Sequence, residues 1–403
     1  MPDHSVDGSE RRALLWWALA LATTWLVLGA MHYSTRDADS RLYSEIAARM
    51  SSTPVSRWIA PDFPPGWFMS GAFREHPAGF FILPALLARM GYPAEQAGYA
   101  IGAFYVAGAI LLLQRLAGAV VPSHDARVLG WALQLIPIAF TYRIRANHEQ
   151  AVLFFLVLAL LGLELARRHV AFVALTVTGL VALLLVKGLF ALFGLAVCAL
   201  WLICLGVVAP RRETIEWRPW IGLALAFLAM AASALLYEHL YRATTGQPFW
   251  SVYASRQLGV AGAAQSASLP NVMWYLGRVA WFPFPCSLAL VALGIAMMRQ
   301  RIAGASSAAP DDPAARAGLV FAVATTVLYV GLFSLSARRA DRYIFPAYYA
   351  VGAAGAIASV RACPPLMRLA RSLDRPWLAP SVFAVTIAAH ILAGWAGLPP
   401  VKL

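Results

Sequence analysis

Long apolar runs separated by short polar segments occur along almost the whole chain. A helix needs about 20 apolar residues to cross the hydrocarbon core of a bilayer, because each residue adds only about 1.5 Å along the axis. Runs of suitable length predict eleven membrane-spanning helices, at residues 13–31, 96–114, 126–141, 150–166, 170–186, 189–208, 219–237, 273–297, 317–336, 343–360 and 378–397. We therefore predict an all-α polytopic membrane protein, in which residues 1–403 form a single membrane domain without a separate soluble domain.

The apolar stretch Ala78–Tyr92 is too short to be a twelfth span, and Pro84 and Arg89 interrupt it. Stretches of this length are typical of interfacial or re-entrant helices. If it does not cross the membrane, the arginine-rich short loops all fall on one side, which the positive-inside rule makes cytoplasmic. The N-terminus is then cytoplasmic, and the long segments 32–92 and 238–272 lie on the outer side.

The composition agrees with a membrane protein. Of the 403 residues, 61% are hydrophobic and 13% are charged, whereas soluble domains carry about 25% charged residues. This excludes a soluble enzyme, a disordered chain and a nucleic-acid binder, although the net charge is +13. The four cysteines show neither metal-site spacing nor a disulfide framework, so we interpret them as buried apolar residues.

Cations on the predicted outer side oppose the usual charge bias, and an anionic ligand would explain why they are there. Beyond the first outer segment, the cations on this side are Arg143, Arg145, Lys187, Arg242, Arg256, Arg278, Arg338, Arg339 and Arg342, with Lys402 in the tail. Three arginines within Arg338–Arg342 indicate phosphate binding, since a guanidinium matches phosphate oxygens, although anionic lipid headgroups would also explain them. For Lys187 two interpretations stay open: it contacts a phosphate, or its side chain extends along the apolar boundary to the lipid headgroups.

Acidic and imidazole side chains also gather in the outer segments. Asp37 and Asp39 follow the first span, where partial desolvation would suit a general base, but where either could simply cap the next helix. Glu75 and His76 could bind a divalent cation or orient a substrate hydroxyl, although a solvated loop would also contain them. The polar stretch 142–150 ends in His148 and Glu149 at the start of a span, where a buried charge is expensive and usually functional.

Taken in order, these clusters resemble the motifs of the GT-C superfamily of membrane glycosyltransferases. The branch concerned holds the protein O-mannosyltransferases and the lipid A aminoarabinose transferase. Asp39–Ala47 looks like the D-E-x-x-Y-x-E-I-A run after that branch's first span, with Asp39 at the aspartate taken as catalytic. Tyr43 takes the place of its tyrosine, and Ser40 departs from its second acid.

The later motifs match in part. Glu75-His76-Pro77 stands where the branch has E-K-P-P or H-P-P, and Glu149 substitutes for its second aspartate. Leu185–Gly188 looks like L-T-K-G, and Arg339–Pro346 resembles K-x-x-x-Y-x-x-P, with Arg339 in the phosphate-contacting place. Tyr253 stands where the aminoarabinose transferase has a histidine metal ligand, so the resemblance does not extend to that ligand.

The resemblance implies a glycosyltransferase that moves a sugar, with inversion, from a polyprenyl-phosphate donor to a lipid, glycan or protein acceptor. It implies the bacterial inner membrane, with the active site facing the periplasm or exterior. Asp39 is the expected general base. The expected donor-phosphate contacts are Arg339, Arg342, Lys187 and Arg143; the expected substrate or metal contacts are Glu75, His76, His148, Glu149, Tyr43 and Tyr343.

Two other classes of protein remain open from the sequence. A polytopic transporter or lipid flippase would also have many spans and charged groups near the membrane, and an inactive assembly subunit would share the fold. Whether the protein needs a divalent cation as cofactor stays open, and Glu75 is the one residue that we consider as its ligand. We expect membrane lipids and a polyprenyl-phosphate sugar as partners, and no nucleic acid.

Overall fold

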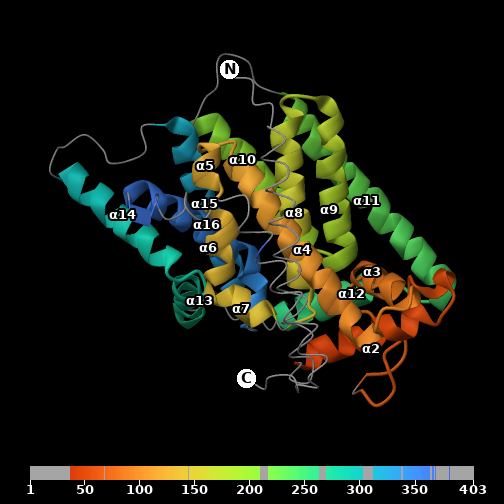
Figure 1. Ribbon diagram of the computed structural model, residues 1–403. Helices are drawn as coiled ribbons and strands as arrows, with labels where there is room; N and C mark the ends of the chain where they lie inside the picture. The colour runs from red at the N-terminus through yellow and green to blue at the C-terminus, as the bar shows by residue number, and fades with distance from the viewer. Residues whose placement is uncertain are drawn as a thin grey trace.

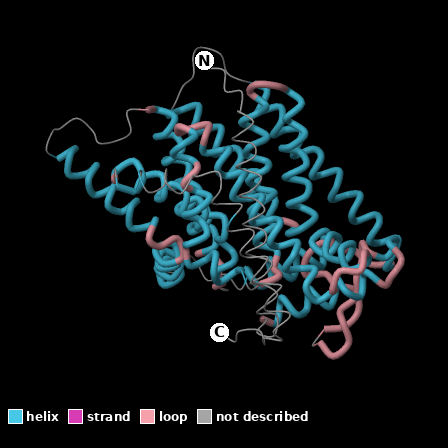
Figure 2. Tube along the Cα trace, viewed as in Figure 1, coloured by secondary structure: helices cyan, strands magenta, loops and turns pink. Residues whose placement is uncertain are grey.

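The computed structural model describes residues 37–67, 69–143, 145–208, 217–262, 269–302, 312–336 and 339–363, with a few isolated positions beyond. These residues are helical apart from loops and one isolated bridge between Asp62 and Ala72 (Figure 2). The all-α prediction is therefore confirmed for the described part of the chain. Its four cysteines are unpaired, and Cys198, Cys204 and Cys286 are buried, as the sequence indicates.

Seven helices are long and apolar enough to cross a membrane, so the chain is a multi-pass membrane protein. They coincide with seven of the predicted spans. They are α4 (Ala94–Ala117), α8 (His148–Ala166), α9 (Val173–Lys187) with η3 (Val170–Phe172), α10 (Phe190–Val208), α11 (Trp217–Thr245), α15 (Pro313–Phe333), and α16 (Phe345–Ala362) with η4 (Asp341–Ile344). All seven have a buried face toward the bundle. Helices α4, α9 with η3, α10, α11 and α15 also expose apolar residues, which suits a lipid environment, whereas α8 and α16 lie mostly inside the bundle.

The other predicted spans have different outcomes. Those at 13–31 and 378–397 lie outside the described residues, so eleven spans are not shown. The prediction of one helix over 126–141 is wrong: the chain forms α5 (Ser123–Ala126), α6 (Leu129–Leu135) and α7 (Pro137–Arg143). Proline disfavours helical backbone in the residue before it, and Ile136 is extended, with φ −72° and ψ 144°. The three short helices follow one another from one end of the bundle to the other (Figure 1).

The span predicted at 273–297 is a bent pair. Helices α13 (Leu269–Trp281) and α14 (Cys286–Ile302) meet at 104° and count as an eighth span only if taken together. The break contains Pro283 and Pro285. Proline cannot donate the backbone hydrogen bond that a continuous helix needs, which accounts for the interruption.

The short helix α3 (Gly79–Arg89) confirms that the stretch after Ala78 is not a span. It lies with α2 (Ala38–Ser51) and α12 (Trp250–Gly262) at one end of the bundle, while α5 and the turn between α8 and α9 lie at the other (Figure 1). Helix α2 packs on α3 and α4 through Tyr43, Ile46 and Met50, which recur at helical spacing. The predicted outer segments therefore share one end.

Gly355 allows α16 to lie directly against the start of α14. A Cβ atom at this position would be 2.0 Å from the carbonyl oxygen of Cys286. We expect Gly355→Ala to lower the free energy of unfolding by about 1–3 kcal/mol, because α14 must move. Thermal unfolding in detergent measures this. In α15, Gly331 has nothing within 4 Å of its virtual Cβ, so Gly331→Ala should leave the midpoint unchanged or raise it; equal effects of the two variants would contradict the packing argument.

Candidate active site

The start of α2 separates the roles of two aspartates. Asp37 is the N-cap of the helix, and its carboxylate accepts a hydrogen bond from the Ser40 amide at 2.7 Å. Asp37 also pairs with Arg145, with 3.0 Å between Oδ2 and Nε. Asp39, in the first turn, pairs instead with Arg342. Capping therefore explains Asp37 and leaves Asp39, whose side chain is 38% exposed, accessible to a substrate.

Arg342 joins the two ends of the described chain at this point. It lies in η4, immediately before α16, and its partner Asp39 is 303 positions earlier. The Arg342 side chain is 23% exposed, so this ion pair lies partly away from solvent. No local pattern in the sequence imposes such a contact; packing of α2 and α16 in one bundle does.

A second ion pair lies beside the first and is more deeply buried. Lys187 Nζ is 3.3 Å from Glu149 Oε1, and their side chains are 12% and 3% exposed. Glu149 is in the first turn of α8 and Lys187 is the last residue of α9, positions that the helix dipoles favour for these charges. Arg342 interacts electrostatically with both, so two acids and two bases form one cluster.

Aromatic and imidazole rings form one wall of this cluster. The His148 ring is 4.3 Å from that of His76, 4.6 Å from that of Tyr43 and 4.4 Å from that of Phe80. Burial lowers the pKa of His76 well below its usual value, and Lys187 and Arg342 lower it further. Burial also raises the pKa of Tyr43, as does the negative charge of Asp39. Both side chains are therefore uncharged at neutral pH.

The lowered pKa of His76 predicts a stability that decreases as the pH falls. Its folded-state pKa is depressed, so below about pH 6.5 the unfolded chain takes up a proton that the folded protein does not. Stability is lost by up to about 1.4 kcal/mol per pH unit. We expect His76→Gln to reduce the drop in thermal midpoint between pH 7.5 and pH 5.0. Identical drops in both proteins would show that His76 does not titrate on unfolding.

Several predicted site residues lie outside this cluster or are not placed. Arg339 is exposed and donates to Asn271 Oδ1 at 2.7 Å, and Tyr343 stacks on Phe333 with 5.2 Å between ring centroids. The Arg143 side chain and Arg338 lie outside the described residues. Glu75 is within electrostatic range of Tyr43. Phosphate contacts of Arg339 and substrate contacts of Tyr343 stay predictions.

The described residues do not fit a resident metal ion. Among them, no three His, Cys, Asp or Glu side chains are grouped closely enough to hold one. Lys187 and Arg342, which interact with His76, would also repel a divalent cation. Glu75 alone is the candidate ligand.

The sequence singled out Arg278 and Arg339 as outer cations but did not indicate their partners at this end of the bundle. Arg278 pairs with Asp341 at 3.1 Å, and its guanidinium lies 4.8 Å from the Trp274 ring centroid. Asn271, about two turns before Arg278 on α13, accepts from Arg339 and donates to the carbonyl of Ser336. Arg278 and Asp341 are more than sixty residues apart along the chain, as are Asn271 and Arg339. No local pattern could therefore indicate these two pairs.

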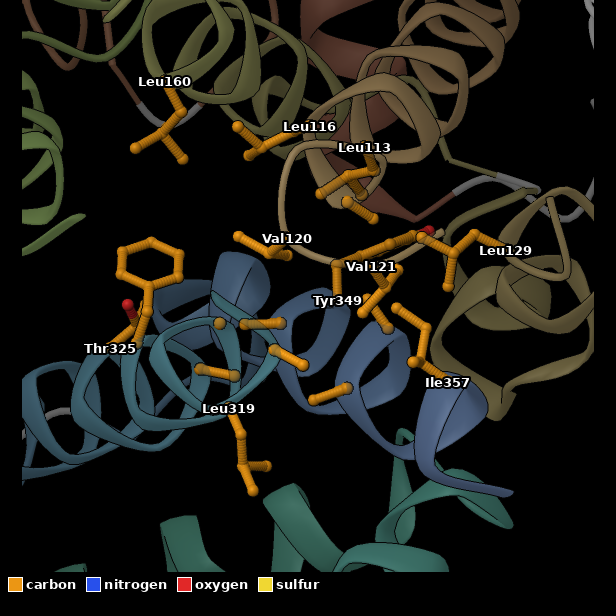
Figure 3. Close-up of a pocket in the computed structure, with 18 of the residues that line it drawn as sticks. Leu113, Leu116, Val120, Val121, Leu129, Leu160, Leu319, Thr325, Tyr349 and Ile357 are labelled. Carbon is orange, nitrogen blue, oxygen red and sulfur yellow. The ribbon is translucent and has the colours of Figure 1, made fainter. Parts of the chain in front are cut away.

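A cavity of about 560 Å³ lies along α16 (Figure 3). It begins at Pro346 and Tyr349, about one helical turn from Arg342, and extends to Arg361. Almost all its lining is aliphatic or aromatic, contributed by α4, α8, α10, α15 and α16. The cavity is therefore suited to a hydrocarbon chain rather than to a hydrated solute.

Comparison with solved structures gives the fold. ArnT from Cupriavidus metallidurans bound to undecaprenyl phosphate superimposes with a TM-score of 0.63 at 17% identity, over 94% of this chain and 75% of ArnT. The archaeal oligosaccharyltransferase AglB from Archaeoglobus fulgidus, in complex with an inhibitory peptide and a dolichol-phosphate, gives 0.55 at 13%, over 95% of this chain and 54% of AglB. The fold is similar to that of these GT-C membrane glycosyltransferases. No family model and no curated protein sequence matches the chain.

Proposed function

We propose that this protein is a glycosyltransferase that moves a sugar from a polyprenyl-phosphate donor to an acceptor hydroxyl or amine. Asp39 accepts the proton of the acceptor as its oxygen or nitrogen bonds to the anomeric carbon. The bond from that carbon to the phosphate oxygen breaks, and the electron pair leaves with the phosphate. Arg342 and Lys187 stabilise the negative charge that develops there. A single displacement of this kind inverts the anomeric centre.

The observation that carries the proposal is the meeting of Asp39 with Arg342 beside Lys187 and Glu149. It brings an accessible carboxylate and two cations together about one helical turn before Pro346, where the α16 lining of an apolar cavity begins. A base, a charge-stabilising site and a channel for a lipid tail are the three parts that the reaction needs. The ArnT and AglB structures contain undecaprenyl phosphate and dolichol-phosphate, and a donor of that class suits this cavity.

The arrangement favours transfer over transport. Transporters usually bind charged substrates near the bilayer midplane, on broken helices. Here the broken pair α13 and α14 contributes no residue to the cluster of Asp39, Glu149, Lys187 and Arg342, which lies at one end of the bundle. We propose that this end faces outward, because the arginine-rich short loops lie at the other.

Purified protein tests the function directly. It is incubated with radiolabelled polyprenyl-phosphate sugars and candidate lipid, glycan or peptide acceptors, with and without a chelator. We expect labelled acceptor to accumulate at the same rate in both conditions, because Lys187 and Arg342 supply the positive charge at the leaving phosphate. Transport of an unmodified labelled lipid across a vesicle membrane, without any transfer, would overturn the proposal.

A further inference from the structure

The backbone at Lys187 is held by a side chain from the long loop region. The Tyr253 hydroxyl, on α12, donates to the Lys187 carbonyl oxygen at 2.9 Å. That carbonyl belongs to the last turn of α9, where the helix itself offers no donor. The next residue, Gly188, has φ +63°, and a Cβ there would be 2.4 Å from the Tyr253 hydroxyl. The chain turns tightly around Tyr253, and only glycine fits the turn.

The same face of α12 holds a second site segment. Gln257, one turn after Tyr253, donates through Nε2 to the Glu75 carbonyl oxygen at 3.1 Å. Glu75 immediately precedes His76, whose ring lies 4.3 Å from that of His148. Residues four apart on a helix share a face, so one short helix holds the backbone beside Lys187 and beside His76.

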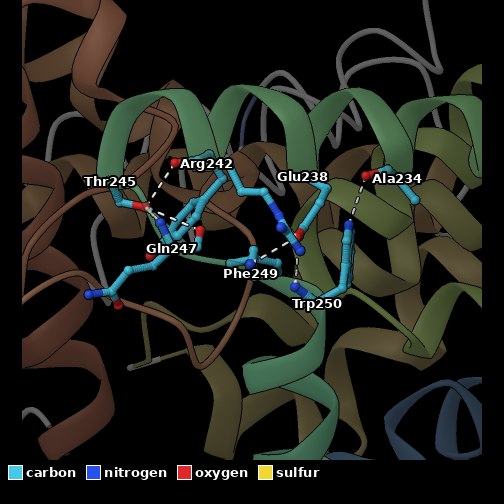
Figure 4. A network of polar contacts seen from close by, with 8 residues as sticks. Ala234, Glu238, Arg242, Thr245, Gln247, Phe249 and Trp250 are labelled. Carbon is cyan, nitrogen blue, oxygen red and sulfur yellow. Dashed lines mark hydrogen bonds and ion pairs between the residues drawn. The ribbon is translucent and has the colours of Figure 1, made fainter.

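Helix α12 is itself fixed to α11 by Glu238 (Figure 4). One carboxylate oxygen accepts from the backbone amides of Phe249 and Trp250, at 2.9 and 3.0 Å, which satisfies amides at the start of α12. The Trp250 indole donates to the Ala234 carbonyl oxygen at 2.8 Å. The Phe249 ring stacks on Tyr253 with an interplanar angle of 12°. Glu238 thus fixes the start of α12 at Phe249, and the Phe249 ring packs against the ring of Tyr253, whose hydroxyl reaches Lys187.

We propose that Tyr253 and Gln257 are positioning residues, which hold Lys187 and the Glu75–His76 segment where the reaction needs them. The inference rests on the proposed function for its kinetic consequence, but the placement of Lys187 can be tested without any substrate. Neither residue touches the predicted reacting groups with its side chain: both act on backbone carbonyls.

Kinetics test the consequence for transfer. We expect Tyr253→Phe, which keeps the ring, to lower kcat by about 3–10-fold while the KM for the donor changes less than twofold, because one hydrogen bond is lost. Gln257→Met should act in the same direction. Tyr329→Phe is the matched control: this tyrosine, on α15, is also buried, and its hydroxyl has no hydrogen-bond partner among the described residues. It should leave kcat unchanged.

Lysine chemistry tests the placement itself. The chain has two lysines, Lys187 and Lys402, so an amine-acylating reagent followed by peptide mass spectrometry reports Lys187 against an internal reference. In the native protein Lys187 should react slowly, because it is buried beside Glu149. We expect the ratio of Lys187 to Lys402 labelling to rise at least about threefold in Tyr253→Phe, and to stay constant in Tyr329→Phe.

The two measurements separate the two proposals. A raised labelling ratio without transfer to any acceptor would remove the transferase function and keep Tyr253 as the residue that fixes Lys187. Normal transfer together with an unchanged ratio and an unchanged kcat in Tyr253→Phe would overturn the positioning role. A lower thermal midpoint with an unchanged ratio would show that Tyr253 only stabilises the fold, which also overturns it.

Discussion

Asp39→Asn should lower the rate of sugar transfer by about 10²–10⁴-fold, the usual cost of losing a general base. Asparagine keeps the size and the hydrogen-bonding oxygen of the side chain, and the position is 38% exposed, so the variant should express and fold. It cannot accept the proton that the acceptor loses. The measurement is the initial rate with saturating donor and acceptor, compared with the native protein at equal amounts of folded material.

The neighbouring Asp37 supplies a matched control. Asp37→Asn keeps a side chain that caps helices well and loses only the charge opposite Arg145, in a pair whose side chains are 35% and 30% exposed. Transfer should stay within about threefold of the native rate, since exposed ion pairs contribute little. Loss of activity in Asp37→Asn, with normal turnover in Asp39→Asn, would move the base away from Asp39.

Hydrophobic patterning predicted the helices wherever the apolar run was uniform. The spans that became α8, α9 and α10 contain no proline, and each is a single helix. The pattern failed at Pro137 and between Pro283 and Pro285, where mean hydropathy is unaffected but backbone hydrogen bonding is interrupted. A window of hydropathy detects the burial of a segment; it does not detect whether the helix continues through it.

Charges near the ends of apolar runs indicated the site, because a charge there is costly unless it has a partner. Glu149 was singled out in this way, Asp39 by its place after the first span and by the family resemblance, and Arg342 by the cluster of arginines around it. Lys187 was left open between a phosphate and the lipid headgroups. The structure brings the four side chains together. Their pairing could not be predicted, since it depends on which helices become neighbours.

The same limit applies to the residues that hold the site. Arg339 looked equivalent to Arg342 in the sequence, yet it pairs with Asn271 on α13. Tyr253 was noted from the sequence only as a departure from a histidine ligand. Its contact with the Lys187 carbonyl, and that of Gln257 with the Glu75 carbonyl, are made to backbone atoms, and a backbone atom carries no sequence signal.

Lys187→Met should destabilise the protein by about 3–5 kcal/mol, because it leaves the Glu149 carboxylate buried without its partner. The Glu149 side chain is 3% exposed, and its Oε1 accepts from Lys187 at 3.3 Å. Thermal unfolding in detergent should show a midpoint several degrees lower. Arg242→Met is the comparison: it removes the cation of a pair whose arginine is 59% exposed, and exposed pairs are worth at most about 1 kcal/mol.

The double variant Lys187→Met with Glu149→Leu distinguishes stability from function. Replacing both members of a buried pair by apolar residues of similar volume is often neutral or stabilising, so the midpoint should return close to that of the native protein. Transfer should not return, because the cation that stabilises the leaving phosphate is still missing. If the double variant regained both stability and transfer, Lys187 would have a structural role alone, and Arg342 would be left as the cation that meets the phosphate.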